Sequence, residues 1–214
     1  MQSERLQQWE DRFYQWLIAQ DSADAAHDTN HINRVVKTAR KLAEAERAEL
    51  AVVIPAAWLH DCVAVAKDDS RRFQASTLAA KKASQLLTEW AYPVKYLPAI
   101  THAIEAHSYS ANIECHTLEA KIIQDADRMD AIGAIGIART VMVGTSLGNP
   151  LTYNEDPFCY HRKPDDGLAM VDHFYTKLLH LKEQFHTQAA RQEANQRHQF
   201  MLDFLKQLER EVIE

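Results

Sequence analysis

The side chains most able to do chemistry are a histidine and an aspartate set side by side in an apolar segment. His60 and Asp61 lie between the stretches AAWL and VAV. An ionised aspartate is rarely buried without a partner, because removing its charge from water is costly. A bound metal ion would supply the missing positive charge. The alternative is that the polar stripe of a helix reaches the surface at this point.

His31, at the head of an expected helix, is a second candidate for metal binding. It follows His27 by four residues, and histidines at this spacing can chelate a metal from one helical face. The residues between them are Asp-Thr-Asn, without the glutamate that metalloprotease helices carry. We therefore place His31 at the metal, and His27 near the helix cap or behind the ligands.

An acidic cluster of Asp125, Asp127 and Asp130 lies in the largely apolar stretch KIIQDADRMDAIGAIGIAR. Asp127 and Asp130 are three residues apart and share a helical face, whereas Asp125 faces elsewhere. Acidic groups in such surroundings need a cation. Either a metal ion or the arginines Arg128 and Arg139 would supply it.

Two histidines and two aspartates from these segments would offer a metal ion nitrogen and oxygen ligands. Such a set suits Mn, Mg, Fe, Co, Ni or Zn and does not choose among them. Four protein ligands leave an octahedral ion positions for water and for a phosphate oxygen. The ion would polarise the phosphate and lower the pKa of the water, as in hydrolysis of phosphate esters.

Composition and charge exclude several classes of function. The 214 residues carry a net charge of −6, which argues against binding a DNA or RNA duplex. The three cysteines are far apart and form no CxxC pair, which favours a reducing compartment over a disulfide framework. Charges interrupt the N-terminal segment, and no run of 18 apolar residues occurs. We expect a cytoplasmic protein that does not bind membranes; a homodimer is compatible with these features.

The spacing of apolar residues predicts an all-α fold. Five glycines and six prolines are too few for the turns of a β architecture. Apolar side chains recur instead at helical spacing along most of the chain. We expect an ordered loop at 144–167, helices again from about 167 to the end, and earlier helices at 4–20, 31–47, 50–66, 72–90, 93–107 and 117–143.

The order of these residues resembles a known family. His31, then His60-Asp61, then Asp127 is similar to the H…HD…D signature of the HD-domain phosphohydrolases. The words HDTNHINRVVKTA, AAWLHDCV and IIQDADRMDAIGAIG resemble the family's first, HD and final acidic helices. The later segments EDPFCYHRKPDDG and HFYTKLLHL resemble the YedJ-like or YpgQ-like bacterial branch. The resemblance covers nearly the whole chain.

The resemblance implies a helical bundle with one divalent metal that hydrolyses phosphoesters or phosphoanhydrides. It implies His31, His60, Asp61 and Asp127 as ligands, with Asp127 chosen over Asp125 because Arg128-Met129 follows it. Asp125 would support the ligands or cap the helix. It also implies a single domain over 1–214, with a core at about 25–145 and appended C-terminal helices at about 165–214.

The chain departs from better-known members of the family directly after the HD pair. Several of them carry an acidic residue there, whereas this chain continues Cys-Val-Ala-Val-Ala, and Lys67 is the first charge. We therefore expect proton transfer from Asp61, His107 or Lys67. His102 could also transfer a proton or hold the phosphate, or it could be a surface or core-edge histidine. The expected phosphate-binding residues, each alternatively an ordinary solvated charge, are Arg34, Lys67, His107, Arg128 and Arg162.

Three functions follow from this reading. The first is a metal-dependent phosphohydrolase acting on a small phosphorylated molecule, with a nucleotide cleaved to its monophosphate and pyrophosphate as the leading substrate. The second is a regulator on the same fold that binds metal or nucleotide without catalysis. The third is a plain helical interaction protein in which the histidines and aspartates coincide by chance.

Overall fold

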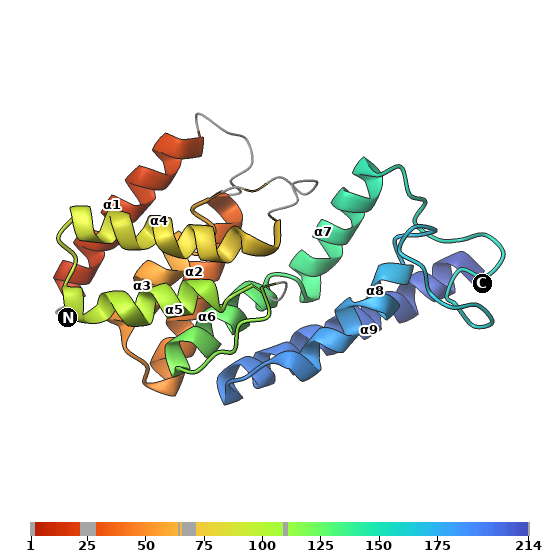
Figure 1. The fold of residues 1–214 in the computed structure, drawn as a ribbon. Helices are drawn as coiled ribbons and strands as arrows, with labels where there is room; N and C mark the ends of the chain where they lie inside the picture. The colour runs from red at the N-terminus through yellow and green to blue at the C-terminus, as the bar shows by residue number, and fades with distance from the viewer. Residues whose placement is uncertain (1–2, 22–28, 64, 66–71, 109–110, 214) are drawn as a thin grey trace. The chain divides into compact units, whose positions relative to one another are not determined.

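A computed structural model describes residues 3–21, 29–63, 65, 72–108 and 111–213 (Figure 1). Every regular element within these ranges is a helix, which confirms the predicted all-α class. The chain divides into two compact units, Met1–Asp127 and Arg128–Glu214. The predicted single domain with a core at about 25–145 stays a prediction.

The first unit begins with three helices whose apolar faces pack together. They are α1 (Ser3–Asp21), α2 (Thr29–Glu46) and α3 (Leu50–Leu59), and α3 contacts both of the others. Nine of the ten residues of α3 are buried, so this helix forms the centre of the unit. A buried carboxylate, Glu10, joins the three helices: it pairs with Arg40 of α2 and accepts a hydrogen bond from the indole of Trp58 in α3.

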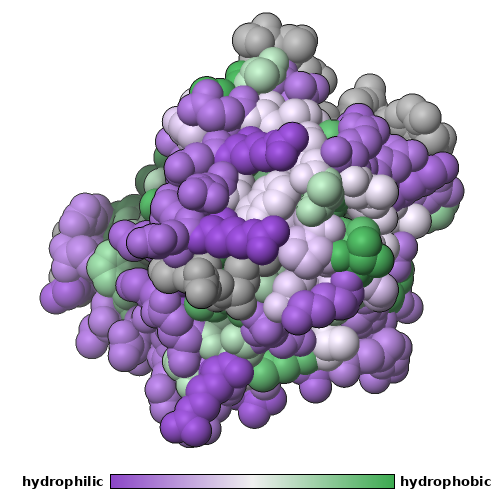
Figure 2. All heavy atoms as spheres, turned by 90° about the vertical axis from the view of Figure 1, so that its left-hand side faces the viewer, coloured by the Kyte–Doolittle hydropathy of each residue, from purple (hydrophilic) through white to green (hydrophobic). Residues whose placement is uncertain are grey.

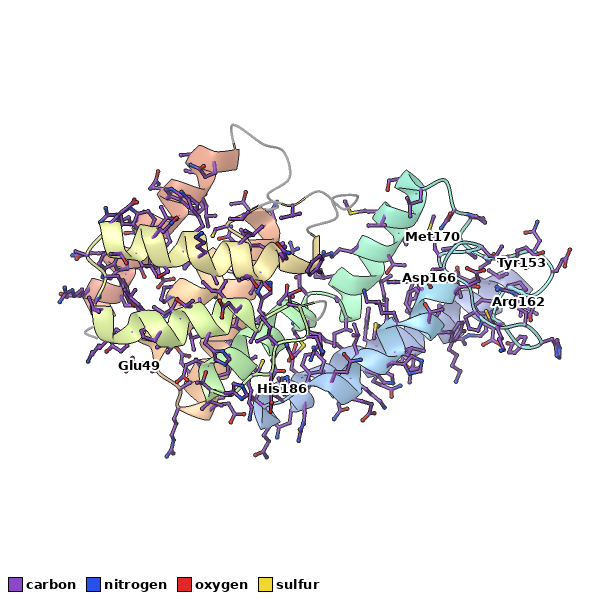
Figure 3. All side chains as sticks on the ribbon, viewed as in Figure 1. Glu49, Tyr153, Arg162, Asp166, Met170 and His186 are labelled. Carbon is purple, nitrogen blue, oxygen red and sulfur yellow. The ribbon has the colours of Figure 1, made fainter. Side chains whose placement is uncertain are left out.

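A proline inside α3 removes one backbone hydrogen bond, and a tyrosine replaces it. Pro55 has no N–H to donate to the carbonyl of Ala51, one turn earlier. The hydroxyl of Tyr92 donates to that carbonyl at 2.6 Å, and Tyr92 is fully buried. The start of α3 is also capped, because the Glu49 carboxylate (labelled in Figure 3) accepts from Ala51 N at 3.0 Å.

The predicted helix at 50–66 is too long. The structure ends α3 at Leu59, and His60 is its C-cap rather than a residue of its middle. The apolar residues on both sides of the pair conceal this end in the sequence. The consequence is that Asp61 lies in a turn with 53% of its side chain exposed, so it is only partly buried and is not enclosed within an apolar helix.

Three further helices complete the first unit. The 3-10 turn η1 (Arg72–Gln74) leads into α4 (Ala75–Glu89), and η2 (Val94–Tyr96) leads into α5 (Leu97–Glu105). Helices α4 and α5 lie side by side, and α5 also packs on α3 (Figure 1). Helix α6 (Leu118–Met129) then brings the acidic cluster to its last turns.

The predicted helix at 117–143 is in fact two helices. Helix α6 ends at Met129, and α7 (Gly133–Ser146) begins four residues later. Ile132 is extended, and Gly133 has a φ of +73°, a backbone conformation that glycine adopts without strain. Gly133 is therefore the residue that signals the break.

The second unit combines helices with an irregular segment between α7 and α8. The elements after α7 are α8 (Asp172–Thr176), η4 (Leu178–Gln184) and α9 (Gln188–Ile213). Helix α9 packs along α7 and η4. Within the described ranges, no helix combines the length and apolarity needed to cross a membrane. The face drawn in Figure 2 carries mainly hydrophilic residues, with small scattered hydrophobic ones.

Candidate metal centre

Helix ends in the first unit bring five candidate side chains together. His31 lies in the first turn of α2, and His60 caps the end of α3, followed by Asp61. His107 comes two residues after the end of α5, and Asp127 lies in the last turn of α6. Because the ends of separate helices meet here, residues up to 96 positions apart in the sequence share one site.

The candidate ligand atoms form two groups that share His60. In one, Asp127 Oδ1 is 3.2 Å from His31 Nε2 and 3.9 Å from His60 Nε2. In the other, Asp61 has Oδ2 at 3.8 Å from His60 Nε2 and Oδ1 at 3.6 Å from His107 Nε2. Within each group, the ligand atoms all lie within 4.8 Å of one another.

Backbone carbonyls orient two of the histidine rings in the same way. His60 Nδ1 lies 2.8 Å from the carbonyl oxygen of Ala57, and His107 Nδ1 lies 2.6 Å from that of Ile104. A carbonyl oxygen only accepts, so each ring carries its hydrogen on Nδ1. Each neutral ring therefore presents the lone pair of Nε2, the arrangement that metal-binding histidines usually have.

His60 provides the structural test of whether a metal fits. Its side chain is fully buried, yet Nε2 has no hydrogen-bond partner among the described residues. Leaving a buried polar atom unsatisfied costs about 1–3 kcal/mol. Ligand atoms around a single ion held at 2.0–2.2 Å lie about 3–3.5 Å apart. The observed separations of 3.2–3.9 Å are close to this range, so the residues fit a divalent cation.

The ionisation of the cluster suits a cation. Burial is the largest influence on His60 and lowers the pKa of its imidazole, which favours the neutral ligand form. Burial raises the pKa of Asp127, but the hydrogen bond from His31 and the charges of the other rings hold it below its usual value. His60 and His107 likewise keep the pKa of Asp61 low against the effect of burial. Both carboxylates are thus ionised at neutral pH.

Helix dipoles add to this preference. Helices α3, α5 and α6 all reach the cluster with their C-terminal ends. The C-terminal end of a helix carries a partial negative charge, worth about 0.3–1 kcal/mol to a nearby cation at exposed sites. The N-terminal end of α2 has the opposite partial charge, so three ends that favour a cation stand against one that opposes it.

Comparison with known proteins identifies the fold. The model of the HD domain matches residues 29–132. The chain is 33% identical to YpgQ of Bacillus subtilis over 99% of its own length and 94% of that protein. The chain belongs to the HD-domain family. Its similarity to YpgQ over nearly the full length confirms the predicted bacterial branch.

Solved structures agree with this assignment. An HD-superfamily hydrolase from Bacillus thuringiensis matches with a TM-score of 0.77 and 33% identity, covering 96% of this chain and 97% of that one. YpgQ of Bacillus subtilis in complex with ADP matches with a TM-score of 0.75 and 31% identity, covering 97% of each chain. The HD fold supports metal-dependent phosphohydrolase chemistry in general, and the matched residues 29–132 contain all five clustered side chains.

The other acidic residues expected near the site have separate environments. Asp130 is paired with Arg139, whose Nη1 lies 2.6 Å from its carboxylate. Arginine therefore supplies the counter-charge of Asp130, whereas histidines surround Asp127. Asp125 is fully buried in α6. The sequence left open whether arginine or a metal ion balances the acidic cluster. In the structure arginine balances Asp130, and the histidines around Asp127 leave that carboxylate available to a metal ion.

The cations expected to bind phosphate are scattered. Arg34 lies on α2 one turn after His31, and Lys67 lies outside the described residues. Arg128 belongs to the second unit, where it donates to the carbonyl of Gln184. Arg162, labelled in Figure 3, forms a two-fold contact with the buried carboxylate of Asp172. Arg34 shares α2 with the candidate ligand His31.

The structure adds one supporting contact to the site and places His102 outside it. Gln124 Nε2 donates to the carbonyl of Ala106 at 2.8 Å, and so fixes the backbone directly before His107. His102 stacks on His116, with ring centroids 5.4 Å apart, instead of joining the cluster. A helical pattern places Gln124 on α6, but only the tertiary fold brings it to the end of α5.

Proposed function

We propose that this protein is a metal-dependent phosphohydrolase whose divalent cation is held by His31, His60, Asp61 and Asp127. The observation that carries the proposal is the buried Nε2 of His60, which lacks a hydrogen-bond partner among the described residues and faces two carboxylates. When bound, the cation would polarise the phosphate and lower the pKa of a water molecule.

The protein's own residues orient the substrate and handle protons. The Asp61 side chain is half exposed, so one edge of the cluster is accessible to substrate. His107 would hold a proton beside Asp61, because the neighbouring carboxylate raises the pKa of its imidazole against the effect of burial. Arg34, one turn after His31 on α2, would offset the phosphate charge, and Lys67 remains a second candidate for that role.

We propose a nucleotide as the substrate, cleaved at a phosphoanhydride or phosphoester bond. Support comes from the related YpgQ, which was crystallised with ADP and shares 31% identity with this chain. A nucleoside triphosphate cleaved to its monophosphate and pyrophosphate is the leading reaction. Residues Arg128 and Arg162 are not needed for this proposal, since each makes a structural contact within the second unit.

The experiment is a hydrolysis screen of nucleotides and simple phosphate esters with Mn, Mg, Co and Ni. The double variant His60→Ala/Asp61→Ala should lose both bound metal and turnover. His116→Ala is the matched control, because this ring is exposed and lies outside the cluster. Full turnover by the double variant, or hydrolysis by the wild type after complete removal of divalent ions, would contradict the proposal.

A second function, a metal- or nucleotide-binding regulator without catalysis, is favoured by one observation. The segment after Asp61 reads Cys-Val-Ala-Val-Ala and offers no carboxylate for proton transfer. Binding of metal and nucleotide with no release of phosphate or pyrophosphate in the same screen would support the regulator. Turnover that depends on His60 would exclude it.

A further inference from the structure

The second unit contains a pocket that none of the candidate metal ligands lines. One wall is formed by Arg139 and Val143 of α7 and by Leu147, the residue that caps this helix, at intervals of four residues. The other wall is formed by Met170, Lys177 and their neighbours. The cavity has a volume of about 360 Å³, which is at the small end of the range for ligand pockets.

The second wall is held in place by hydrogen bonds, so the pocket is preformed. Met170 N donates to the carbonyl of Pro150 at 3.0 Å, and Asn149 Nδ2 donates to that of Asp166 at 3.0 Å. The Asp166 carboxylate also binds His173 Nδ1 at 2.8 Å. Asp166 and Met170 are labelled in Figure 3. Both lie in a segment without regular structure, and these bonds fix its backbone at both sides of the pocket.

A glycine allows the floor of the pocket to form. A Cβ atom added at Gly144 would lie only 2.4 Å from Cγ of Met170. The absence of a side chain at Gly144 lets Met170 lie directly against α7. The thioether of Met170 thus covers the helix and gives the pocket an apolar floor that adapts to a flat or branched group.

Apolar side chains remain exposed around this floor. Val143 is 44% exposed and Leu147 is 68% exposed, and both line the pocket. Single exposed apolar residues are ordinary, but those that converge on a concave site are typical of ligand binding. The apolar part of a small molecule would remove both side chains from water.

Cationic groups at the same pocket define the rest of the ligand. The Lys177 side chain is exposed and makes no hydrogen bond or ion pair with any of the described residues. Its charge helps to keep the pKa of Asp166 low. Arg139 keeps 47% of its side chain exposed while its Nη1 binds Asp130. The buried Asp130 balances part of the Arg139 charge from outside the lining, so the exposed Lys177 and the exposed part of Arg139 are the positive groups that face the cavity, with Asp166 as the one acidic residue of the described lining.

We propose that this pocket binds a small organic anion, in which a phosphate or carboxylate is attached to an apolar body. The anion lies at Lys177 and Arg139, and the apolar body lies over Val143, Leu147 and Met170. This site is separate from the proposed phosphohydrolase activity, and its occupancy does not require a metal.

The test is calorimetric titration of the full chain, with EDTA present, using four probes. AMP and octanoate carry both an anion and an apolar body, whereas adenosine and inorganic phosphate each carry one of the two. At least one of the first pair should bind about tenfold more tightly than either of the second pair. Binding of AMP alone identifies a phosphate ligand, and binding of octanoate alone identifies a carboxylate.

Two pairs of variants locate the binding. Val143→Trp fills the pocket and should abolish binding, while Met142→Trp, at the next position and 70% exposed, should leave it unchanged. Lys177→Glu should weaken binding about tenfold, while Lys206→Glu on α9 should not. If Val143→Trp fails to fold, the lysine pair decides, because both lysines are exposed.

Three results would overturn the proposal. The first is that neither AMP nor octanoate binds. The second is that adenosine binds as tightly as AMP, which would remove the role of the anion. The third is that Lys177→Glu and Lys206→Glu have equal effects, which would place the binding elsewhere on the protein.

Discussion

At the scale of single residues, the candidate centre is made by side chains with restricted freedom. His60 and His107 each bind a carbonyl three residues earlier, so the backbone selects both the tautomer and the direction of the ring. The sequence indicated His31, His60, Asp61 and Asp127 through their order along the chain. It could not reveal that His107 lies within 3.6 Å of Asp61, because that distance depends on how α5 packs against α3.

The ionisation of His107 gives a prediction about the metal-free protein. Asp61 raises the pKa of this imidazole through a hydrogen bond and its charge, against the effect of burial. Replacing the carboxylate by an amide removes the favourable charge, so the pKa of His107 should fall in Asp61→Asn. The measurement is an NMR titration of the imidazole nitrogens with EDTA present. An unchanged midpoint would show that Asp61 does not control this ring.

At the scale of helices, the main differences from the sequence-based prediction occur at helix ends. The predicted helix at 50–66 ends at Leu59, because apolar residues continue beyond the actual end of α3. The predicted helix at 117–143 is interrupted, and the positive φ of Gly133 accounts for the interruption. Apolar spacing therefore gave the class and approximate positions of the helices, whereas caps and breaks depend on local backbone geometry.

The replacement of a missing helical hydrogen bond by Tyr92 gives a prediction for α3. Tyr92→Phe would leave the Ala51 carbonyl without the donor that Pro55 cannot provide. Burying an unsatisfied carbonyl should lower the free energy of unfolding by about 1–3 kcal/mol. Urea denaturation measures this change. Tyr14→Phe is the control, since this exposed tyrosine should change stability by less than about 0.5 kcal/mol.

At the scale of the whole molecule, the two proposed sites lie in different units. All five clustered side chains belong to Met1–Asp127, and the proposed anion pocket belongs to Arg128–Glu214. The sequence analysis expected Arg162 to bind phosphate as one of several candidate fixed cations. In the structure its guanidinium donates hydrogen bonds to the Asp172 carboxylate. Sequence patterns do not predict this contact, because the two residues are ten positions apart, across an irregular segment.

The Arg162–Asp172 pair gives a prediction about the stability of the chain. Arg162→Gln would leave the buried Asp172 carboxylate without its counter-charge, which should cost about 3 kcal/mol at pH 7. Lys163→Gln, at the next and exposed position, is the matched control. Denaturation in urea compares the two variants with the wild type, and equal stability of all three would contradict a structural role for the pair.

The pH dependence of that loss follows from the ionisation of Asp172. Burial raises the pKa of this carboxyl, but the bond from Arg162 more than offsets it and keeps the pKa below normal. The stabilisation is therefore present above the unfolded pKa of about 3.9 and is lost as pH falls through the lower folded value. The difference between wild type and Arg162→Gln should shrink steadily below about pH 4.

Metal binding should stabilise the chain through the first unit. A ligand at 100 times its dissociation constant adds about 2.7 kcal/mol when it binds only the folded state. Thermal unfolding with Mn or Ni should therefore move to higher temperature in the wild type, and should not move in His60→Ala. An equal shift in both proteins would place the stabilising ion away from the cluster.

The position of the clustered residues at helix ends has a consequence for mutational tolerance. The first turn of α2 and the C-terminal ends of α3, α5 and α6 carry the proposed metal ligands and His107, while the buried apolar side chains elsewhere in these helices pack against one another. Apolar positions in those portions can exchange leucine, isoleucine, methionine and valine at modest cost. A saturation library selected for folding alone should accept many such exchanges. A library selected for metal retention should accept the same exchanges but should reject substitutions at His31, His60, Asp61 and Asp127. The sequence of the apolar positions can thus vary widely while the proposed metal ligands stay the same.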